Sequence, residues 1–428
     1  MKILFLFTGS YPFPGAKEDT FLTQEIVVLR HYFDQIYICP FDCRGKPIKV
    51  EFDNVKVVLD YFRFKKNKLR IIMCAIKAAF SVRVMNEARS LAKFNVVSAM
   101  RGLLIAIGYA TFSDLTSKWL RVFLAREKVG PADVYLYTWW FNYITNGLLE
   151  LAAKNGLQVL SRAHGYDLYE RRRNPPVIPF RECSMSKIKV VVTDSVAGAI
   201  YLRDKYPTHA NKVVVGLLGT QDPGFINPTP TDDCFRIVSC SVLVKVKRID
   251  YIINGISAFA VRHPALKLEW IHFGDGPEKR HLETLAEKVM PVNVKWSMPG
   301  YPGLEQLLSY YRDHSINTFI NASESEGTPV SIIEALSVGI PIIATKVGGN
   351  IEAVGKENGL LIPLTEDPDI LYSAIDALYL NKAGQKSLRA GSRLCWEKNY
   401  QACNNYDTFA EILMGLHSTP PPFTGHSA

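Results

Sequence analysis

The stretch INASESEGTPVSIIEALSVGIPIIATKVGGN, residues 320–350, is the strongest indication of the fold of this chain. An apolar run (316–320) leads into a polar loop (321–327), a short helical segment follows, and a second apolar run (340–345) comes after it. This order predicts a strand-loop-helix-strand unit, which is the repeating element of parallel α/β folds.

The ends of the helix in this unit are marked by residue type. Thr328 is a favourable N-cap, and Pro329 is a favourable first helical residue because the N–H that proline lacks would be unpaired there. Gly339 then ends the helix, and Pro341 prevents it from continuing.

Glu326 and Glu334 flank the predicted helix N-terminus. With Glu334 about two turns into the helix, the two carboxylates are expected about 12 Å apart. A glycosidase pair needs about 5 to 9.5 Å, so the spacing argues against that reaction. The helix N–H groups between the acids favour a phosphate. Such a spacing also occurs by chance on solvated helices, but the Gly-Thr-Pro helix start after a buried strand favours a nucleotide-sugar site.

The chain has 428 residues, 48% of them hydrophobic, which is enough for two domains of about 200 residues each. Continuous apolar runs alternate with helical patterns, as in parallel sheets that are covered on both faces. The predicted strands are residues 3–7, 35–39, 55–59, 134–137, 158–161, 189–193, 212–217, 236–240, 268–273, 293–296, 316–320, 340–344 and 359–362. The predicted fold class is α/β, with two doubly wound Rossmann-like domains that face each other across a cleft.

The Pro-, Thr- and Asp-rich stretch 219–233 is predicted to link the two domains. Residues 1–218 would form one domain and residues 234–400 the other, with a ligand in the cleft at the carboxyl ends of the strands. A C-terminal helix, 401–416, would cross back to the first domain, and the tail 417–428 is predicted to be disordered.

The net charge of +9 is concentrated between residues 61 and 130, where fourteen cations face three acids. Basic, apolar helices favour an anionic membrane surface, and a solvated helical face explains the pattern equally well. No motif for binding nucleic acid is present, so no nucleic-acid partner is expected.

Two apolar runs are candidates for a targeting segment or a transmembrane helix, and neither is predicted to be one. The apolar run 3–7 is predicted as a first strand rather than a signal peptide, and 100–112 is too short to span a bilayer. The eight cysteines lack C-x-x-C spacing and are expected to be reduced thiols, which indicates a cytoplasmic protein.

Other polar residues follow predicted strands. Lys247 and Arg248 open a helix after the strand at the start of the second domain, where two cations could neutralise a diphosphate, although loop lysines are commonly only solvated. FGDGP (273–277) and KVGGN (346–350) are glycine turns that a nucleotide could approach, and an ordinary turn also explains them.

In the first half, SRAHGYDLY (161–169) places His164 and Asp167 just past the carboxyl end of a strand. A lone histidine is more often structural than catalytic. Its expected position at the mouth of the cleft makes His164 a candidate site residue.

Together these segments resemble the family 4 retaining glycosyltransferases, which have the GT-B fold. The most specific of them is ESEGTPVSIIEA (324–335), when it occurs together with the others. The others are the N-terminal glycine loop with TFLTQEI (20–26), HGYD (164–167), VVTDS (191–195), the Lys247–Arg248 pair and GDGP (274–277).

The resemblance implies a role for each matching residue. Glu326 would bind hydroxyls of the transferred sugar, Glu334 the nucleotide ribose and Lys247 the diphosphate, while His164 would contact the sugar from the first domain. His164, Lys247 and Glu326 form the implied catalytic set. The implied donor-binding residues are Ser241, Arg248, Gly274, Asp275, Gly327, Thr328, Pro329 and Glu334, and the implied N-terminal loop residues near donor or acceptor are Gly9, Gly15 and Thr20. Such enzymes need no metal or cofactor.

Two features depart from the family pattern. The family has Gly-Arg where this chain has Ser241 and Val242, so one expected cation is absent, and Arg248 is the candidate replacement. The N-terminal loop has Gly9 and Gly15 apart rather than as a pair.

The implied reaction is retaining transfer of a sugar from a UDP- or GDP-linked donor to a saccharide or a polyprenyl-diphosphate-linked acceptor. The expected setting is bacterial capsule, O-antigen or exopolysaccharide synthesis, in the cytoplasm or at the inner face of the cytoplasmic membrane. Two alternatives stay open: a nucleotide-sugar 2-epimerase of the same architecture, and an inactive nucleotide-sugar-binding subunit, which Val242 favours.

Overall fold

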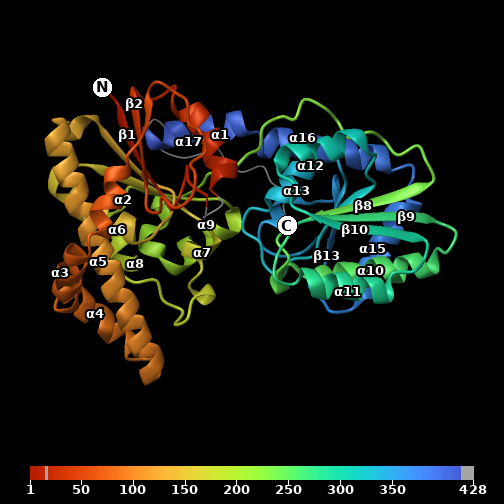
Figure 1. Cartoon of the computed structure of the whole chain (residues 1–428), viewed down its shortest axis with the longest axis horizontal. Coiled ribbons are helices and arrows are strands. Elements are labelled where there is room, and N and C mark those ends of the chain that lie inside the picture. Colours follow the sequence, from red (N-terminus) through yellow and green to blue (C-terminus); the bar gives the residue numbers. More distant parts are fainter. Residues whose placement is uncertain (15–17, 416–428) are drawn as a thin grey trace. The chain divides into compact units, whose positions relative to one another are not determined.

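The computed structural model describes residues 1–14 and 18–415, which fold into two compact α/β units (Figure 1). The first comprises Met1–Gly216 and the described residues from Cys403 onward, and the second comprises Leu217–Ala402. Each unit has one parallel sheet with helices on both faces, so the predicted fold class is confirmed.

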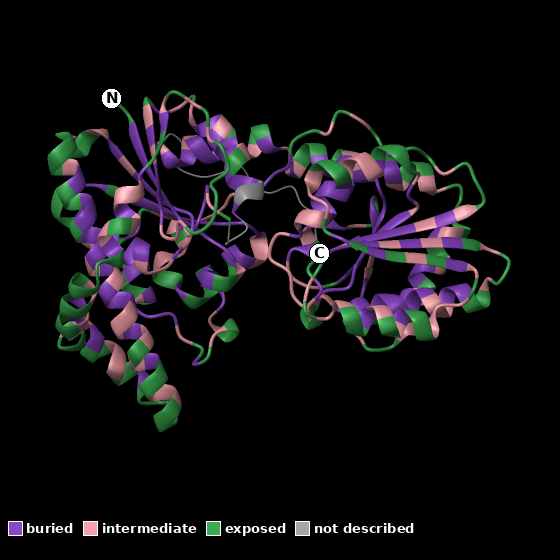
Figure 2. Ribbon diagram, viewed as in Figure 1, coloured by how far each residue is buried: buried purple, intermediate pink, exposed green. Residues whose placement is uncertain are grey.

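The sheet of the first unit has seven strands in the order β3-β2-β1-β4-β5-β6-β7. Its central strands are buried, β1 along its whole length, as expected for a parallel sheet covered on both faces (Figure 2). The strands are β1 (Ile3–Thr8), β2 (Gln35–Pro40), β3 (Val55–Val57), β4 (Val134–Thr138), β5 (Gln158–Ala163), β6 (Val190–Thr193) and β7 (Val213–Val215). The helices are α1 (Asp19–Leu29), α2 (Leu59–Lys66), α3 (Lys68–Ala79), α4 (Val82–Leu91), α5 (Val96–Glu127), α6 (Tyr143–Asn155), α7 (Gly165–Leu168), α8 (Arg181–Lys187), α9 (Val196–Lys205) and α17 (Ala402–Leu413).

The sheet of the second unit has six strands in the order β10-β9-β8-β11-β12-β13. The strands are β8 (Cys234–Cys240), β9 (Lys267–Phe273), β10 (Val294–Gly300), β11 (Thr318–Asn321), β12 (Ile342–Thr345) and β13 (Gly359–Ile362). The helices are α10 (Ile249–Arg262), α11 (Lys279–Val289), α12 (Leu304–Asp313), α13 (Val330–Ser337), α14 (Asn350–Ala353), α15 (Pro368–Leu380) and α16 (Gln385–Asn399). Every strand predicted from an apolar run has a counterpart in one of the two sheets.

Both sheets reverse their winding direction once. The reversal lies between β1 and β4 in the first unit and between β8 and β11 in the second. At such a switch point the loops that follow the two central strands diverge, and the space outside their carboxyl ends is where open α/β sheets bind ligands.

Helix α13 begins one residue later than its sequence predicts. Its first helical residue is Val330, and Pro329 is the N-cap, without a side-chain hydrogen bond to the helix. Thr328 is therefore not the N-cap, because the ψ angle of 79° at Pro329 lies outside the helical range. The predicted helix end is confirmed: Gly339 follows with φ +77°, a conformation that glycine adopts without strain.

The segment 219–233, predicted as a linker, packs within the second unit. Asn227 is buried, its amide donates to the carbonyl of His314 at 2.8 Å, and Arg389 Nη2 donates to its side-chain oxygen at 2.8 Å. Helix α17 groups with the first unit, where the ring of Phe409 packs at a tilt against that of Tyr137, with 5.0 Å between ring centroids. Gly15 and the tail 417–428 lie outside the described residues.

Helix α5 is much longer than the apolar run 100–112 and is long and apolar enough to cross a membrane by length and composition. Core helices of soluble proteins share that property. Its C-terminal half is such a helix, since Trp119, Leu120 and Phe123 belong to the core of the first unit.

A buried ion pair joins the sheet of the first unit to α1. Arg162 on β5 lies 2.9 Å from Glu25 on α1, and both side chains are almost completely inaccessible. Arg162 also donates to the Tyr137 hydroxyl at 3.0 Å and lies over the ring of Phe409. Burial raises the pKa of the Glu25 carboxyl, and the Arg162 guanidinium opposes that shift.

Removing one partner of this pair leaves a buried charge without its counterion. We expect Arg162→Ala to lower the free energy of unfolding by about 3–5 kcal/mol in chemical denaturation. Arg126→Ala, which removes an exposed arginine paired with Asp60, is the matched control and is expected to change stability little. Equal small effects of the two substitutions would show that the buried pair does not hold the layers together.

Candidate functional site

The switch point of the second sheet brings Lys247 and Glu326 together. Lys247 ends a short 3₁₀ turn (Lys245–Lys247) after β8, and Glu326 lies in the loop after β11. The Lys247 ammonium donates to Glu326 Oε1 at 2.6 Å, and both side chains are largely buried. These residues are 79 positions apart in the chain, and the pairing of β8 with β11 makes them neighbours.

Two further side chains fix the Glu326 carboxylate. Ser323 Oγ donates to Oε1 at 2.6 Å, and the Asn321 amide donates to the same oxygen at 3.1 Å. Thr345 at the end of β12 donates to the Ser323 carbonyl at 2.6 Å, so two adjacent strands hold this loop. The carboxylate is therefore oriented before any ligand arrives, with Oε2 left for a further donor.

The glycine turn in KVGGN supports the same loop from beneath. A Cβ atom on Gly348 would lie 2.0 Å from the carbonyl oxygen of Glu326, and one on Gly349 would lie 1.9 Å from that of Gly327. Gly348 also has φ +45°. Any side chain at these positions would displace the loop, so the turn is a support for Glu326 and Gly327 rather than an ordinary turn.

Glu334 is the other acid of the predicted pair, and it is buried at 5% exposure. Because α13 begins at Val330, Glu334 lies about one turn into the helix, not two. Within residues 1–14 and 18–415 its carboxyl has no hydrogen bond or ion pair, and burial raises its pKa from 4.5 to about 8. A buried carboxyl without a partner is costly, which is typical of a group that waits for ligand hydroxyls.

A chain of buried hydrogen bonds positions the loop after β8. Trp270 Nε1 donates to Ser239 Oγ at 3.0 Å, Ser239 Oγ lies 2.9 Å from His272 Nδ1, and His272 Nε2 lies 3.1 Å from the carbonyl of Ser241. Burial lowers the pKa of His272 to about 4, so its ring is neutral at pH 7. A neutral ring that donates from Nε2 and accepts at Nδ1 satisfies the whole chain.

The GDGP turn lies against this loop. A Cβ on Gly274 would lie 1.8 Å from the Ser241 carbonyl oxygen, so only glycine fits there. Asp275 accepts the Leu243 N–H on its carbonyl at 2.9 Å and the Gly276 N–H on its carboxylate at 2.7 Å. The structure thus brings Ser241, Gly274 and Asp275 together as predicted, in roles that shape the loop.

The partners of Arg248 differ from those of Lys247. It has φ +51°, is 4% exposed, and its guanidinium donates to the Thr365 carbonyl and to Glu366. It also lies over the Tyr251 ring at 4.4 Å. One nitrogen, Nη1, is buried without a partner among the described residues. A role of Arg248 as the second diphosphate cation stays a prediction.

In the first unit, His164 is buried between aromatic rings. Its ring lies 4.6 Å from Trp139 and 5.0 Å from Trp140, and Nδ1 lies 3.2 Å from the carboxylate of Asp194. Burial disfavours the protonated ring, but Asp194 outweighs it and the pKa of His164 is raised. Nε2 is buried and unpartnered in the described part of the chain. Contact of His164 with a sugar stays a prediction.

Asp167 has a structural role. Its carboxylate accepts the N–H groups of His164, at 2.6 Å, and of Phe141, so it joins the loops after β5 and β4. Burial raises its pKa.

The N-terminal loop is occupied by a carboxylate of the same unit. Glu18 accepts the N–H groups of Gly9 at 2.6 Å, Ser10 at 2.8 Å and Tyr11 at 2.9 Å, and also that of the Trp140 indole. Three successive N–H groups around one anion form a nest. Gly9 therefore binds an internal carboxylate in this structure, and only the backbone of Thr20, in α1, is described.

Some site residues were missed from sequence. Asn321 and Ser323 could have been found, because they stand in the polar loop directly after a predicted strand. Asp194 lies in the VVTDS segment without having been given a role. Glu18 has no sequence signal, since its partners are backbone groups and an indole on another loop.

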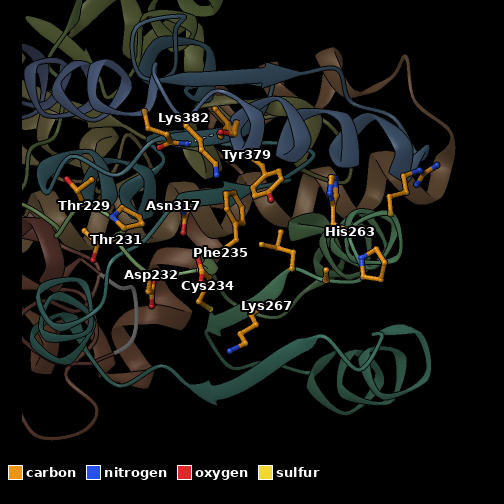
Figure 3. Close-up of a pocket in the computed structure, with 18 residues that line it drawn as sticks. Thr229, Thr231, Asp232, Cys234, Phe235, His263, Lys267, Asn317, Tyr379 and Lys382 are labelled. Atoms are coloured by element: carbon orange, nitrogen blue, oxygen red, sulfur yellow. Dashed lines mark hydrogen bonds between the residues drawn. The ribbon is translucent and has the colours of Figure 1, made fainter.

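A cavity of the second unit lies away from these residues. It has a volume of about 870 Å³ and is lined by residues at the amino ends of β8 and β9, such as Cys234 and Lys267, with His263 and Tyr379 (Figure 3). Strand starts and strand ends are opposite edges of a parallel sheet. None of its lining residues is among the candidate site residues.

No group of three or more His, Cys, Asp or Glu side chains is placed to hold a metal ion in residues 1–14 and 18–415. Metal independence stays a prediction.

Residues 234–381 match the sequence family described as glycosyl transferases group 1. A relative from Streptococcus parasanguinis, the GtfA subunit of a UDP-N-acetylglucosamine–peptide N-acetylglucosaminyltransferase, is 27% identical over 45% of this chain and 38% of its own length. The Escherichia coli O-antigen biosynthesis glycosyltransferase WbnH is 34% identical over 26% of this chain and 31% of its own length. The matches thus span about a third of these relatives.

Among solved structures, sucrose-phosphate synthase from Thermosynechococcus elongatus is similar with a TM-score of 0.70, at 15% identity, over 97% of this chain and 99% of that one. This similarity establishes the fold. The chain has the two-domain architecture of GT-B glycosyltransferases, and the resemblance to glycosyl transferases group 1 is confirmed for its second unit.

The raised pKa of Glu334 predicts a pH dependence of stability. Between about pH 4.5 and 8 the unfolded chain loses the proton of this carboxyl while the folded chain keeps it, so its contribution to stability falls as the pH rises. Glu334→Gln has no such proton. Between pH 5 and pH 8 we expect the free energy of unfolding of the variant to rise by more than about 1 kcal/mol relative to that of the parent.

Glu305→Gln, an exposed glutamate on α12, is the control for this measurement by denaturation at several pH values. A stability difference for Glu334→Gln that stays constant with pH would show that the carboxyl is ionised in the folded protein.

Proposed function

From the match of the second unit to glycosyl transferases group 1, we propose that the protein is a retaining glycosyltransferase that uses a nucleotide-diphosphate sugar. The observation that carries the proposal is the Lys247–Glu326 pair at the switch point of the second sheet, beside the N-terminus of α13. A cation and an oriented carboxylate at this position suit a ligand with a diphosphate and sugar hydroxyls.

In this proposal the donor binds between Lys247 and Glu326 and breaks their ion pair. The diphosphate binds the Lys247 ammonium and the N–H groups at Gly327 and Thr328, while sugar hydroxyls donate to Glu326. Ser323 and Asn321 keep the Glu326 carboxylate in place when Lys247 turns to the phosphate. Lys247 thereby exchanges its contact with Glu326 for a contact with the diphosphate, and both contacts are charge-assisted, so the free energy of ground-state binding changes little. In the transition state the same ammonium stabilises the negative charge that develops on the leaving diphosphate.

Transfer with retention would proceed by cleavage of the bond between the sugar and the diphosphate while the acceptor hydroxyl forms the new glycosidic bond on the same face of the sugar. The proton of that hydroxyl passes to the departing phosphate oxygen. The oxocarbenium-like transition state places growing negative charge on the diphosphate, where Lys247 acts. Neither Glu326 nor Glu334 is assigned as a general acid or base. Glu334 binds the ribose, because it is buried and lacks a partner in the described protein.

We propose a saccharide or a polyprenyl-diphosphate-linked saccharide as acceptor, with UDP or GDP on the donor. The WbnH relative is named for O-antigen biosynthesis, which supports surface-polysaccharide synthesis as the setting, whether capsule, O-antigen or exopolysaccharide. The proposed location is the cytoplasm, at the inner face of the cytoplasmic membrane.

A second candidate is a nucleotide-sugar-binding subunit without activity of its own. Val242 is exposed at the position where the family has an arginine, and the Streptococcus parasanguinis relative is named as a subunit. Thermal shifts with UDP-, GDP- and ADP-sugars, followed by product analysis with donor alone and with acceptors, separate the candidates. A ligand at 100 times its Kd adds about 2.7 kcal/mol to the free energy of unfolding. Binding without transfer to any acceptor would favour the subunit, and a donor converted without acceptor would favour the epimerase.

Lys247→Ala tests the diphosphate assignment. We expect kcat/KM to fall by at least about a hundredfold, because the transition state loses its cation, while the melting temperature stays near that of the parent. Lys245→Ala, an exposed lysine of the same turn, is the matched control and should retain activity. Turnover by Lys247→Ala within threefold of the parent would remove Lys247 from the mechanism.

Nucleotide binding is expected to release a proton from Glu334. Ribose hydroxyls that donate to the carboxylate favour its ionised form, so the raised pKa should fall in the complex. Calorimetry of nucleotide binding at pH 7 in buffers of different ionisation enthalpy should show proton release for the parent and none for Glu334→Gln. Equal proton release by both proteins would place the nucleotide away from Glu334.

A further inference from the structure

Helix α3 exposes a stripe of large apolar side chains. Leu69, Ile72, Met73, Ile76 and Phe80 recur at intervals of one, three and four residues, which places them on one helical face. Each is between 55% and 81% exposed. Soluble helices of this length normally turn such a stripe to the core.

The inner face of α3 carries mostly small residues, together with the half-buried Ile71. Cys74 and Ala78 are its only buried side chains among the described residues, and Ala78 packs with Val84 of α4 and Ala110 of α5. The helix thus turns small residues inward and large apolar residues outward. Packing within the unit does not explain this arrangement, because the outward residues contribute nothing to its core.

The neighbouring helices continue the pattern. On α4, Val82 and Met85 are exposed. The first turns of α5 expose Val96, Val97 and Met100, each above 60%, and no residue of α5 before Gly102 is buried. In Figures 1 and 2, α3 and α4 lie beside α5, with exposed residues along all three helices. We call the exposed side chains of α3, α4 and residues 96–104 the outer apolar face.

The charges around the outer apolar face are almost all positive. Between Lys68 and Leu104 the chain has seven cations and one acid, Glu87. Arg83 is paired with Asp114 of α5 and with Glu150 of α6. The other cations, Lys68, Arg70, Lys77, Arg89, Lys93 and Arg101, are exposed and have no ion pair in the described part of the chain.

We propose that the outer apolar face docks the protein on an anionic lipid bilayer, with the α3 stripe inserted among the lipid headgroups and the surrounding lysines and arginines on acidic phosphates. A bilayer of this kind offers both partners that the face needs, an apolar layer beneath a layer of negative charge. A second copy of the chain would bring these six cations, which have no ion pair within the described residues, against another six and is disfavoured.

This inference deepens the proposed function, which places the enzyme at a membrane, and it rests on that proposal only for its biological meaning. The face and the donor site belong to different units, and vesicle binding needs neither donor nor transfer. A donor site that fails its own tests therefore leaves the lipid measurement intact, and the converse also holds.

Vesicle co-sedimentation of the full chain tests the proposal. We expect at least tenfold stronger binding to vesicles with 30% phosphatidylglycerol than to pure phosphatidylcholine at low salt, and weaker binding at 0.5 M salt. Ile72→Ser/Met73→Ser/Ile76→Ser should lose at least tenfold in binding, and so should Lys68→Glu/Arg70→Glu/Lys77→Glu. Both variants should keep the parent melting temperature, because all six side chains are exposed or on the surface.

The matched control is Val261→Ser/Val292→Ser/Leu380→Ser, which removes exposed apolar residues of the second unit and should bind vesicles like the parent. The proposal is overturned if the parent stays in the supernatant with anionic vesicles at low salt, or if the α3 variants bind as the parent does. It is also overturned if light scattering shows a dimer that the α3 apolar variant converts to monomer, since the face would then be covered by a second copy.

Discussion

In the second sheet β8 is hydrogen-bonded to β11, and the chain leaves these two strands toward opposite edges of the sheet. Everything at the candidate site depends on this pairing. It places the Lys245–Lys247 turn next to the loop that carries Glu326, although the two segments are far apart in the chain. Because parallel strands put all their carboxyl ends on one edge, the glycine turns after β9 and β12 reach the same place, and there they support the loops that carry the charged residues.

The candidate site also shows how buried titratable groups are accommodated in the folded chain. Glu326 is charged and satisfied, by a lysine and two neutral donors. Glu334 is buried, has no partner within the described part of the chain, and avoids most of the cost by keeping its proton, as its pKa of about 8 indicates. His272 is also neutral at pH 7, because burial lowers its pKa, and its neutral ring joins Ser239 to the Ser241 carbonyl.

The first unit uses the same topology differently. At its switch point, between β1 and β4, the nest of N–H groups at Gly9–Tyr11 holds Glu18, so this loop binds an internal anion. Its distinctive part is the helical segment α2–α5 between β3 and β4, which combines a core helix with an outward apolar stripe. If that stripe meets lipid, the inversion of large and small residues on α3 is explained, because the bilayer replaces the missing core.

The amino-acid sequence by itself determined the strands, the parallel winding and the glutamates of the 320–350 stretch, because apolar runs, glycine turns and acids after strand ends are local patterns. It also revealed the basic, apolar character of residues 61–130. Only the tertiary structure decided which groups meet. The partners of Glu326, the isolation of Glu334, the Glu18 nest and the engagement of Arg248 with Thr365 all depend on loops brought together by strand pairing across the sheet. Distances between such loops, and the burial that shifts a pKa, are properties of the packed chain and leave no periodic trace in the sequence.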